Sequence, residues 1–280
     1  MLDSPTLASL MAGYRVSPDV QKTQTAFRMQ LVDVWGIQAG ERVLEIGCGQ
    51  GDTTAALANC VGPDGEVTAV DIADPSYGAP VTIGDSAEHL MASSLCGRLE
   101  FRFGFDANEQ TFDPDSFDHV VLALCTWYVG SLDVLRATLK AIRPWAPRLC
   151  LSEWDLEPRS LTSMGHLLAV LVQGQVEAHK PTSTANVRTP YSRETLYRLL
   201  SETGWKVTME SVFDVPYLDD GKWEMDACLE NSLREADELK LPLKQRELLA
   251  SQADVVRRLK AEGNIRPLPC YAIVAERASD

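Results

Sequence analysis

The chain has 280 residues, of which 26 are Lys or Arg and 40 are Asp or Glu, so its formal net charge is −14 at pH 7. A chain of this length can bury a large core without disulfides or a structural metal, and it fits one large domain or one domain with an elaborate lid. The acidic balance argues against nucleic acid or an anionic membrane as a partner, because their phosphates would be repelled.

Targeting and metal-binding patterns are absent from the sequence. Residues 1–16 have no basic start and no long apolar run, so we expect no secretory signal. No stretch of about 18 apolar residues occurs, so we expect no membrane-spanning helix and a cytoplasmic location. The seven cysteines form no CxxC pair and the four histidines no HExxH pattern. These spacings indicate reduced thiols and no metal site.

Short apolar strands alternate with helices through the first half of the chain. Apolar side chains recur at helical spacing over 18–35, which predicts an amphipathic helix. A buried strand at 42–46 runs into glycines, and the next helix starts with Asp52 as its expected N-cap. Residues 73–85 are rich in Pro, Gly and Ser and read as a loop. Further helices are expected at 6–14, 52–60, 86–95 and 131–142, and further strands at 67–72, 99–103, 119–124 and 149–154.

After the fifth strand the pattern changes to long helices. A strongly apolar helix is predicted at 161–178. Two charge-rich helices are predicted at 221–239 and 243–262, and this acidic segment is expected to form a solvated lid face. Another helix is expected at 192–203, and the last strands at 205–215 and 269–276. The alternation predicts an α/β fold, a Rossmann-like seven-stranded, mostly parallel sheet with helices on both faces and a helical lid.

The chain divides into four parts in this interpretation. Ligands of open α/β sheets bind at the carboxyl ends of the strands, so we expect the lid to lie over those ends. The parts are an N-terminal helical segment at 1–35, the Rossmann-like core at 36–156, a helical lid insertion at 157–191, and the end of the core sheet at 192–280, with a helical insertion at about 217–265.

A glycine-rich loop at 47–51 follows the first strand, and glycine lets a backbone approach a ligand closely. The dinucleotide pattern GxGxxG would require a third glycine at position 52, where Asp52 stands, a poor neighbour for a pyrophosphate. Glu45, just before the loop, suits a cationic ligand better than a phosphate. Asp71 ends the second strand, where an acidic side chain can accept both hydroxyls of a ribose. These features indicate a nucleoside with a positively charged tail.

The motifs Glu45-x-Gly47-x-Gly49-x-Gly51 and Val70-Asp71 resemble those of class I S-adenosyl-L-methionine (SAM) dependent methyltransferases. The resemblance covers roughly residues 20–155 and is nearest to the small-molecule, ubiquinone/menaquinone type. It continues through Phe105-Asp106-Ala107, Phe117-Asp118 and Arg143-Pro144. It implies SAM as methyl donor and S-adenosyl-L-homocysteine (SAH) as product. The donor-binding residues that it implies are Glu45, Gly47, Cys48, Gly49, Gly51, Asp71, Ile72, Asp106, Ala107, Leu124 and Tyr14.

Within this resemblance, Asp106 would accept a hydrogen bond from the adenine amine, and the Ala107 amide would face the ring. The Leu124 carbonyl would accept from the ammonium of the donor, and Tyr14 belongs to a segment that often folds over it. The chain departs from the pattern in two places. The loop at 74–84 is longer than usual, and Trp145-Ala146 stands where the family has a glycine pair. The helices after residue 156 match no motif, so the resemblance does not supply the acceptor site.

Acceptor-side candidates follow the fourth and fifth strands. Trp127, Tyr128 and Trp154 are predicted to bind substrate, since aromatic faces near a carboxylate suit an amine, an ammonium or a flat aromatic molecule. Packing of sheet against lid is the alternative for both tryptophans. Candidate catalytic groups are Glu153, His166 and His179. The two histidines are 13 positions apart, a rotation of roughly 220°, so at most one points into a site.

Methyl transfer is an in-line displacement in which the protein supplies alignment and excludes water. A base is needed only if the acceptor must lose a proton. We therefore predict a SAM-dependent methyltransferase acting on an O or N atom of a small molecule. One alternative is a protein or RNA methyltransferase, which the charge of −14 and the lack of an Asn-Pro-Pro-Tyr-like run disfavour. The other is a SAM-binding protein that does not methylate, such as a sensor or a pericyclase.

Overall fold

A single seven-stranded sheet in the order β3-β2-β1-β4-β5-β7-β6 forms the centre of the computed structural model, which describes residues 1–278. Strands β1 to β5 are parallel, and β7 runs antiparallel to β5 and to β6. This confirms the predicted Rossmann-like, mostly parallel sheet. The strands are β1 (Arg42–Ile46), β2 (Glu66–Asp71), β3 (Leu99–Phe103), β4 (His119–Ala123), β5 (Arg148–Trp154), β6 (Trp205–Phe213) and β7 (Cys270–Arg277).

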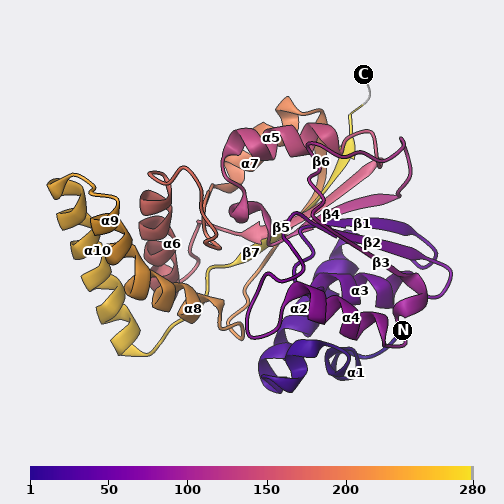
Figure 1. Cartoon of the computed structure of the whole chain (residues 1–280), viewed down its shortest axis with the longest axis horizontal. Coiled ribbons are helices and arrows are strands. Elements are labelled where there is room, and N and C mark those ends of the chain that lie inside the picture. The colour runs from indigo at the N-terminus through magenta and orange to yellow at the C-terminus, as the bar shows by residue number, and fades with distance from the viewer. Residues whose placement is uncertain (279–280) are drawn as a thin grey trace.

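Helices cover both faces of the sheet (Figure 1). Because both faces are covered, β4 and β5 are continuously buried instead of alternating between core and solvent. One face carries α1 (Ser4–Ser9), α2 (Pro18–Trp35), α3 (Asp52–Val61) and α4 (Ile83–Met91), and the other carries α5 (Leu132–Ala141) and α7 (Arg193–Glu202). Single 3-10 turns are η1 (Ala12–Arg15), η2 (Cys96–Arg98), η3 (Thr126–Tyr128) and η4 (Leu161–Ser163).

Polar caps fix where several helices begin. The Ser131 hydroxyl accepts from the Val134 amide at the start of α5, and Thr82 caps α4 in the same way. The predicted N-cap of α3 was wrong by one residue. Gly51, with φ of 83°, holds that position, and Asp52 is the first helical residue, where it accepts from Gln21 Nε2 at 2.6 Å.

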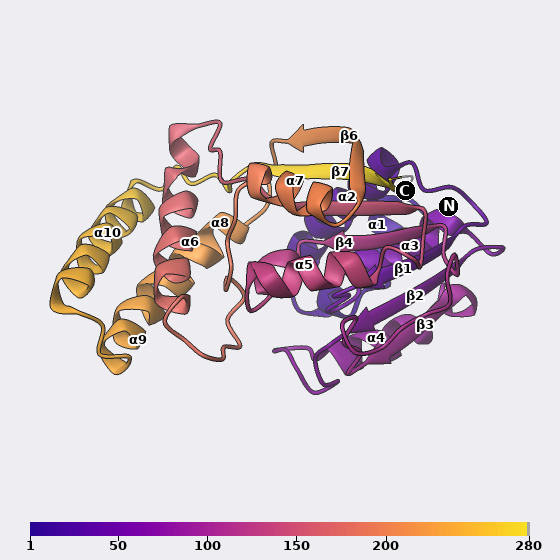
Figure 2. The same cartoon turned by 90° about the horizontal axis from the view of Figure 1, so that it is seen from above.

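A second helical group, here called the helical lid, lies beyond one end of the sheet (Figures 1 and 2). It has an apolar core of its own, in which Val172 and Val176 pack with Met225, Leu249 and Val256. Residues 164–177 of the lid insertion predicted at 157–191 fall in this group, whereas Val187 and Tyr191 of the same insertion pack in the main core. A π-helical turn interrupts the helix expected at 221–239. The helical lid comprises α6 (Met164–Glu177), α8 (Asp220–Ala227), η5 (Cys228–Ser232), α9 (Leu233–Glu238) and α10 (Leu243–Glu262).

Two general features hold within residues 1–278. No helix there combines the length and the apolar character needed to cross a bilayer. All seven cysteines are free thiols.

Candidate functional site

The glycine loop after β1 is held in a shape that only glycine adopts without strain. Gly47, Gly49 and Gly51 have φ of 74°, 51° and 83°, in the left-handed region. A Cβ added at Gly47 would lie 2.8 Å from the Cβ of Cys125. The Cys125 thiol donates to the Ile46 carbonyl at 3.2 Å. The loop therefore passes directly against the chain that leaves β4.

Glu45 lies buried under this loop, at 2% exposure, and accepts a hydrogen bond from the Thr54 hydroxyl at 2.5 Å. Burial raises the pKa of Glu45 to about 8, although the Thr54 bond and the charge of Arg28 oppose this shift. A nearby positive charge would stabilise the ionised form of this buried carboxyl group. Its position supports the expected cationic ligand.

Asp71 ends β2 with both carboxylate oxygens held beside the loop. Its Oδ2 accepts from the Gly49 amide at 2.8 Å, and its Oδ1 accepts from the Ala73 amide at 2.9 Å. Each oxygen has a further lone pair for a hydroxyl donor. The side chain of Ile72 is 67% exposed, so an apolar surface lies open next to this carboxylate.

The turns after β3 and β4 complete the same edge of the sheet. The Phe105 amide donates to the Asp71 carbonyl at 2.9 Å, which places the turn containing Asp106 and buried Ala107 beside β2. Leu124 adopts a left-handed φ of 52° directly after β4. The predicted donor residues thus lie at the ends of four neighbouring strands, where the strand order reverses between β1 and β4.

The N-terminal segment packs near the glycine loop. Tyr14 lies in η1, with Lys22 Nζ 5.9 Å from the centre of its ring, and η1 packs against α2 and α4. Cys48 is buried within the loop, where its amide donates to the Val70 carbonyl at 3.1 Å. The structure therefore shows a backbone hydrogen bond for Cys48, and it holds Tyr14 in a turn packed against α2 and α4.

A cavity of about 220 Å³, here called the acceptor cavity, lies between the end of the sheet and the helical lid, and Leu124 is part of its lining. Of the residues predicted on the acceptor side, it brings together Trp127, Tyr128, Glu153, Trp154 and His166. The complete lining is Arg28, Leu124, Trp127, Tyr128, Glu153, Trp154, His166, Val170, Asn186, Val187, Asp220, Trp223 and Glu224.

His179 is the one acceptor-side prediction that the structure does not bring to the acceptor cavity. It follows the end of α6, is exposed, and lies 2.9 Å from Gln245 Nε2 through its own Nε2. The rotation between the two histidines along α6 explains this outcome, because only His166 faces inward.

His166 does face the acceptor cavity, but its hydrogen bonding argues against the predicted role as a base. Its Nδ1 accepts from the Leu268 amide at 2.9 Å, so in the neutral ring the proton is on Nε2. Complete burial lowers the pKa of His166 to about 3. Neither nitrogen therefore has a lone pair available for a substrate proton.

Glu153 organises the wall of the acceptor cavity. Its Oε2 accepts from the Thr126 amide at 3.0 Å, the Thr126 hydroxyl at 2.7 Å and the Trp127 amide at 3.2 Å. Its Oε1 accepts from the Trp154 amide at 3.0 Å. Burial raises the pKa of Glu153, and the four donors oppose that shift. These bonds fix the backbone of both tryptophans, so Glu153 is a positioning residue for the aromatic wall.

Two carboxylates of α8 were missed as site residues, because the sequence predicted this segment as a solvated face. Asp220 accepts from Gln24 Nε2 of α2 at 2.9 Å, and Glu224 accepts from Gln173 Nε2 of α6 at 2.9 Å. Burial raises the pKa of both carboxyl groups. The sequence did contain a signal for this pair. Two acidic residues four positions apart share one face of a helix, and Trp223 stands between them in the sequence.

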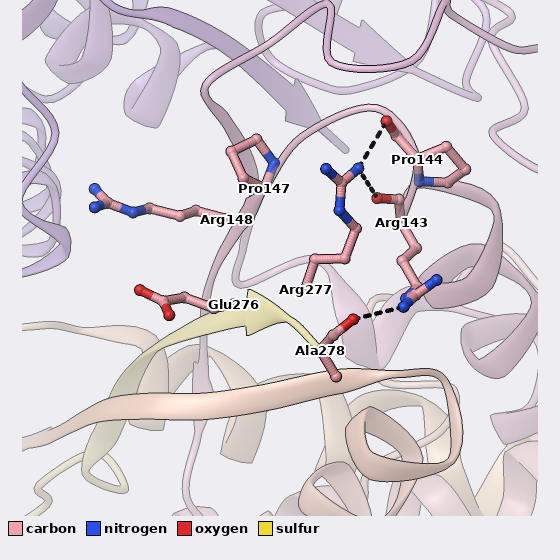
Figure 3. Close-up of a pocket in the computed structure, with 7 residues that line it drawn as sticks. All are labelled: Arg143, Pro144, Pro147, Arg148, Glu276, Arg277 and Ala278. Atoms are coloured by element: carbon pink, nitrogen blue, oxygen red, sulfur yellow. Dashed lines mark hydrogen bonds between the residues drawn. The ribbon is translucent and has the colours of Figure 1, made fainter. Parts of the chain in front are cut away.

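A larger open hollow of about 640 Å³ lies at the opposite end of the sheet, where β5 begins and β7 ends (Figure 3). An Arg143 Nη donates to the Ala278 carbonyl at 2.8 Å, and an Arg277 Nη donates to the Pro144 carbonyl at 3.4 Å. These bonds attach the last strand to the turn before β5. None of the predicted site residues lies here.

Metal ligands are also not grouped in the described part of the chain. Residues 1–278 contain no cluster of three or more His, Cys, Asp or Glu side chains that could hold a metal ion.

Comparison with known proteins agrees with this geometry. The model of the methyltransferase domain family matches residues 21–210. The ubiquinone/menaquinone biosynthesis C-methyltransferase UbiE of Pseudomonas fluorescens is 27% identical over 184 residues, which cover 62% of this chain and 68% of that protein. UbiE of Pseudomonas syringae is 28% identical over the same length.

Solved structures show the same fold. A cyclopropane-fatty-acyl-phospholipid synthase-like protein from Lactobacillus casei is 33% identical, with a TM-score of 0.85 and coverage of 98% of both chains. The [4+2]-cyclase SpnF has a TM-score of 0.55 at 14% identity, covering 91% of this chain and 81% of that one, which shows the fold alone.

The fold and the strand-end loops define a class I SAM-dependent methyltransferase. The chain belongs to the methyltransferase domain family, because the family model spans more than half of its length.

Proposed function

We propose that this enzyme transfers the methyl group of SAM to an oxygen or nitrogen atom of a small molecule held in the acceptor cavity. The observation that carries this proposal is the position of the cavity. Its lining includes Leu124, the residue whose carbonyl is expected to hold the ammonium of the donor, together with aromatic and acidic side chains.

The strand-end loops fit the donor. Asp71 offers two carboxylate oxygens to the ribose, exposed Ile72 offers apolar surface to the adenine, and Asp106 offers a carboxylate to the adenine amine. The left-handed Leu124 and buried Glu45 favour the positively charged end. SAM supplies a methyl group on a sulfonium when it is bound, and these residues orient it toward the acceptor cavity.

The size and lining of the acceptor cavity support a small acceptor. Its volume of about 220 Å³ lies below the roughly 300–1,000 Å³ of pockets that hold drug-sized ligands. Trp127 and Trp154 are almost fully buried, while Trp223 is 47% exposed at the lid. A wall of this kind excludes water from the acceptor and suits a flat molecule or a cationic nitrogen.

Asp220 and Glu224 are the proposed proton acceptors. A hydroxyl or ammonium nucleophile must lose a proton before or during attack, and a base works best when its pKa is near the working pH. Burial raises the pKa of both carboxyl groups toward that range. Their bonds to Gln24 and Gln173 hold them in place at the cavity wall.

Carbon methylation is the second candidate, because the curated relatives at 27–28% identity are C-methyltransferases. The same carboxylates would serve there, since removal of a phenolic or enolic proton also makes the neighbouring carbon nucleophilic. Carbon-13 NMR of the product separates the cases, because a methyl group on oxygen, nitrogen or carbon has a distinct chemical shift.

Methyl transfer itself is the test. Purified protein is incubated with methyl-labelled SAM and a cell extract, and small molecules, protein and RNA are separated. Label in the small-molecule fraction supports the proposal. Label only in protein or RNA, or no label despite tight donor binding, contradicts it.

Matched variants then locate the chemistry. At least one of the two variants Asp220→Asn and Glu224→Gln should form the labelled product at least tenfold more slowly than the parent protein. SAH affinity should stay within about twofold of the parent value in both variants. Glu230→Gln, on an exposed residue of the same helical lid, is the control and should behave as the parent. Equal turnover in all three variants would remove both carboxylates from the mechanism.

A further inference from the structure

Within residues 1–278, three buried N–H donors lining the acceptor cavity have no hydrogen-bond partner: Nη1 of Arg28, Nε1 of Trp127 and Nε2 of His166. The last two belong to uncharged side chains, which are 2% and 0% exposed. A buried donor left without a partner carries a desolvation cost that no hydrogen bond offsets. A ligand oxygen in the cavity would remove that cost, so the two donors point to a hydrogen-bond acceptor on the bound molecule.

The direction of the hydrogen bond at His166 follows from the backbone. The Leu268 amide donates to Nδ1 at 2.9 Å, so the neutral ring carries its proton on Nε2. Trp127 Nε1 is also a hydrogen-bond donor, because an indole nitrogen can only donate. His166 comes from α6 of the helical lid, and Trp127 comes from η3 beside the sheet. One ligand oxygen, or two neighbouring ones, would thus connect the lid to the core.

The charges in the acceptor cavity decide what kind of acceptor fits. Three carboxyl groups line it, those of Glu153, Asp220 and Glu224, against one guanidinium from Arg28, whose Nη1 is the third unpartnered donor. The charge of Arg28 already acts on Glu45 and Asp220, where it opposes the rise in pKa that burial causes. A ligand carboxylate would meet this excess of negative charge in a water-poor site, where repulsion is strong. An uncharged carbonyl oxygen meets the same two N–H donors without that repulsion.

We propose that the methyl acceptor carries an uncharged carbonyl oxygen, which binds between Trp127 Nε1 and His166 Nε2. His166 is then a substrate-binding donor, and the proton-accepting role stays with the carboxylates of α8. This inference rests on the proposed function for the identity of the cavity, and it adds the chemical class of the substrate.

Binding of small probes to the SAH-saturated protein tests the inference without any turnover. Acetophenone and ethylbenzene share one ring and nearly one shape, but only acetophenone has a carbonyl oxygen. Benzoate supplies the charged counterpart. Dissociation constants are measured by calorimetry and by ligand-observed NMR. Acetophenone is expected to bind at least about tenfold more tightly than ethylbenzene, and more tightly than benzoate.

Two substitutions remove the donors one at a time. Trp127→Phe deletes the indole N–H and keeps an aromatic ring. In His166→Asn the amide oxygen takes the place of Nδ1 and still accepts from Leu268, but no atom reaches the position of Nε2. Each should weaken acetophenone about three- to tenfold and leave ethylbenzene unchanged. Trp35→Phe is the matched control, because Trp35 Nε1 is also buried without a partner but lines no part of the acceptor cavity.

The outcomes separate the two claims. Loss of acetophenone affinity in Trp127→Phe and His166→Asn, but not in Trp35→Phe, supports the inference even if no methyl acceptor is found in the extract. Three results would overturn the inference: equal binding of acetophenone and ethylbenzene, tightest binding of benzoate, or no binding of any probe to the parent protein. Labelled small molecules in the extract would still support the proposed function in each of these cases. Melting temperatures show whether each variant is folded, and either cavity variant alone suffices for the comparison.

Discussion

Replacement of Asp71 by alanine is the sharpest test of the donor site, because both oxygens of this side chain are already fixed. They accept from the amides of Gly49 and Ala73 at 2.8 and 2.9 Å, which aims their remaining lone pairs outward from the end of β2. Two ribose hydroxyls would each donate to an ionised acceptor, and such a bond contributes roughly 1.5–3 kcal/mol. The sum of roughly 3–6 kcal/mol corresponds to a loss of about 10²- to 10⁴-fold in donor affinity.

Calorimetric titration with SAM and with SAH measures this loss directly. Asp74→Ala is the matched control, since Asp74 holds the Ser76 amide at 2.9 Å in a similar turn three residues further along but is exposed and belongs to no donor motif. Asp71→Asn keeps one acceptor oxygen and should bind with intermediate affinity. The melting temperature separates loss of the ribose contacts from collapse of the loop.

Donor affinity of Asp71→Ala within threefold of the parent would refute this reasoning. It would mean that the carboxylate only braces the glycine loop and that the ribose is held elsewhere. An equal loss in Asp74→Ala would show instead that the whole loop at 74–84 controls binding.

Three further outcomes follow from the site. Burial raises the pKa of Glu45 to about 8 in the free protein, and a cationic donor lowers it again, so donor binding should release a proton and strengthen as the pH rises toward 8. Calorimetry in two buffers of different ionisation enthalpy measures the number of protons released on binding. Glu45→Gln should abolish this release. If the parent protein releases no proton, Glu45 is not linked to donor binding. Gly47→Ala combines a left-handed φ of 74° with a Cβ placed 2.8 Å from that of Cys125, and we expect a stability loss of roughly 1–3 kcal/mol and impaired donor binding, measured by denaturant melts and titration. Glu153→Gln sets an amide NH₂ among four hydrogen-bond donors. We expect turnover to fall and the free energy of unfolding to drop by roughly 1–3 kcal/mol, while SAM affinity stays near that of the parent protein. An unchanged melting temperature would argue against the positioning role of Glu153.

The sheet and its order of elements were accessible from local patterns. The helix at 18–35 and the strands at 42–46 and 99–103 have the predicted boundaries, because apolar periodicity and glycine breaks act over a few residues. The start of α3 was displaced by one residue, since the left-handed Gly51 replaced the expected side-chain cap. The helix at 221–239 is broken by a π-helical turn, for which the pattern of apolar side chains gave no signal.

The predicted donor side of the site was also readable in the sequence, because its residues, apart from Tyr14, lie at or shortly after the ends of strands in the parallel sheet. Once the strands align, the ends of β1, β2, β3 and β4 meet at one edge without further information. The acceptor side was readable only in part. Trp127 and Tyr128 shortly follow β4, and Glu153 and Trp154 are the last residues of β5, so local patterns found all four. The other walls of the cavity include side chains of the helical lid, which these patterns did not indicate.

The sequence by itself therefore determined the class of enzyme, since glycine spacing and strand-end carboxylates are local features with a fixed place in the fold. Only the tertiary structure decided the chemistry of the acceptor cavity. It brought Asp220 and Glu224 against a wall formed about 70–100 residues earlier in the chain. It also turned His166 from an expected base into a donor, through one amide that is 102 residues away in the sequence. Burial and long-range hydrogen bonds set protonation states, and neither is encoded in the spacing of neighbouring residues.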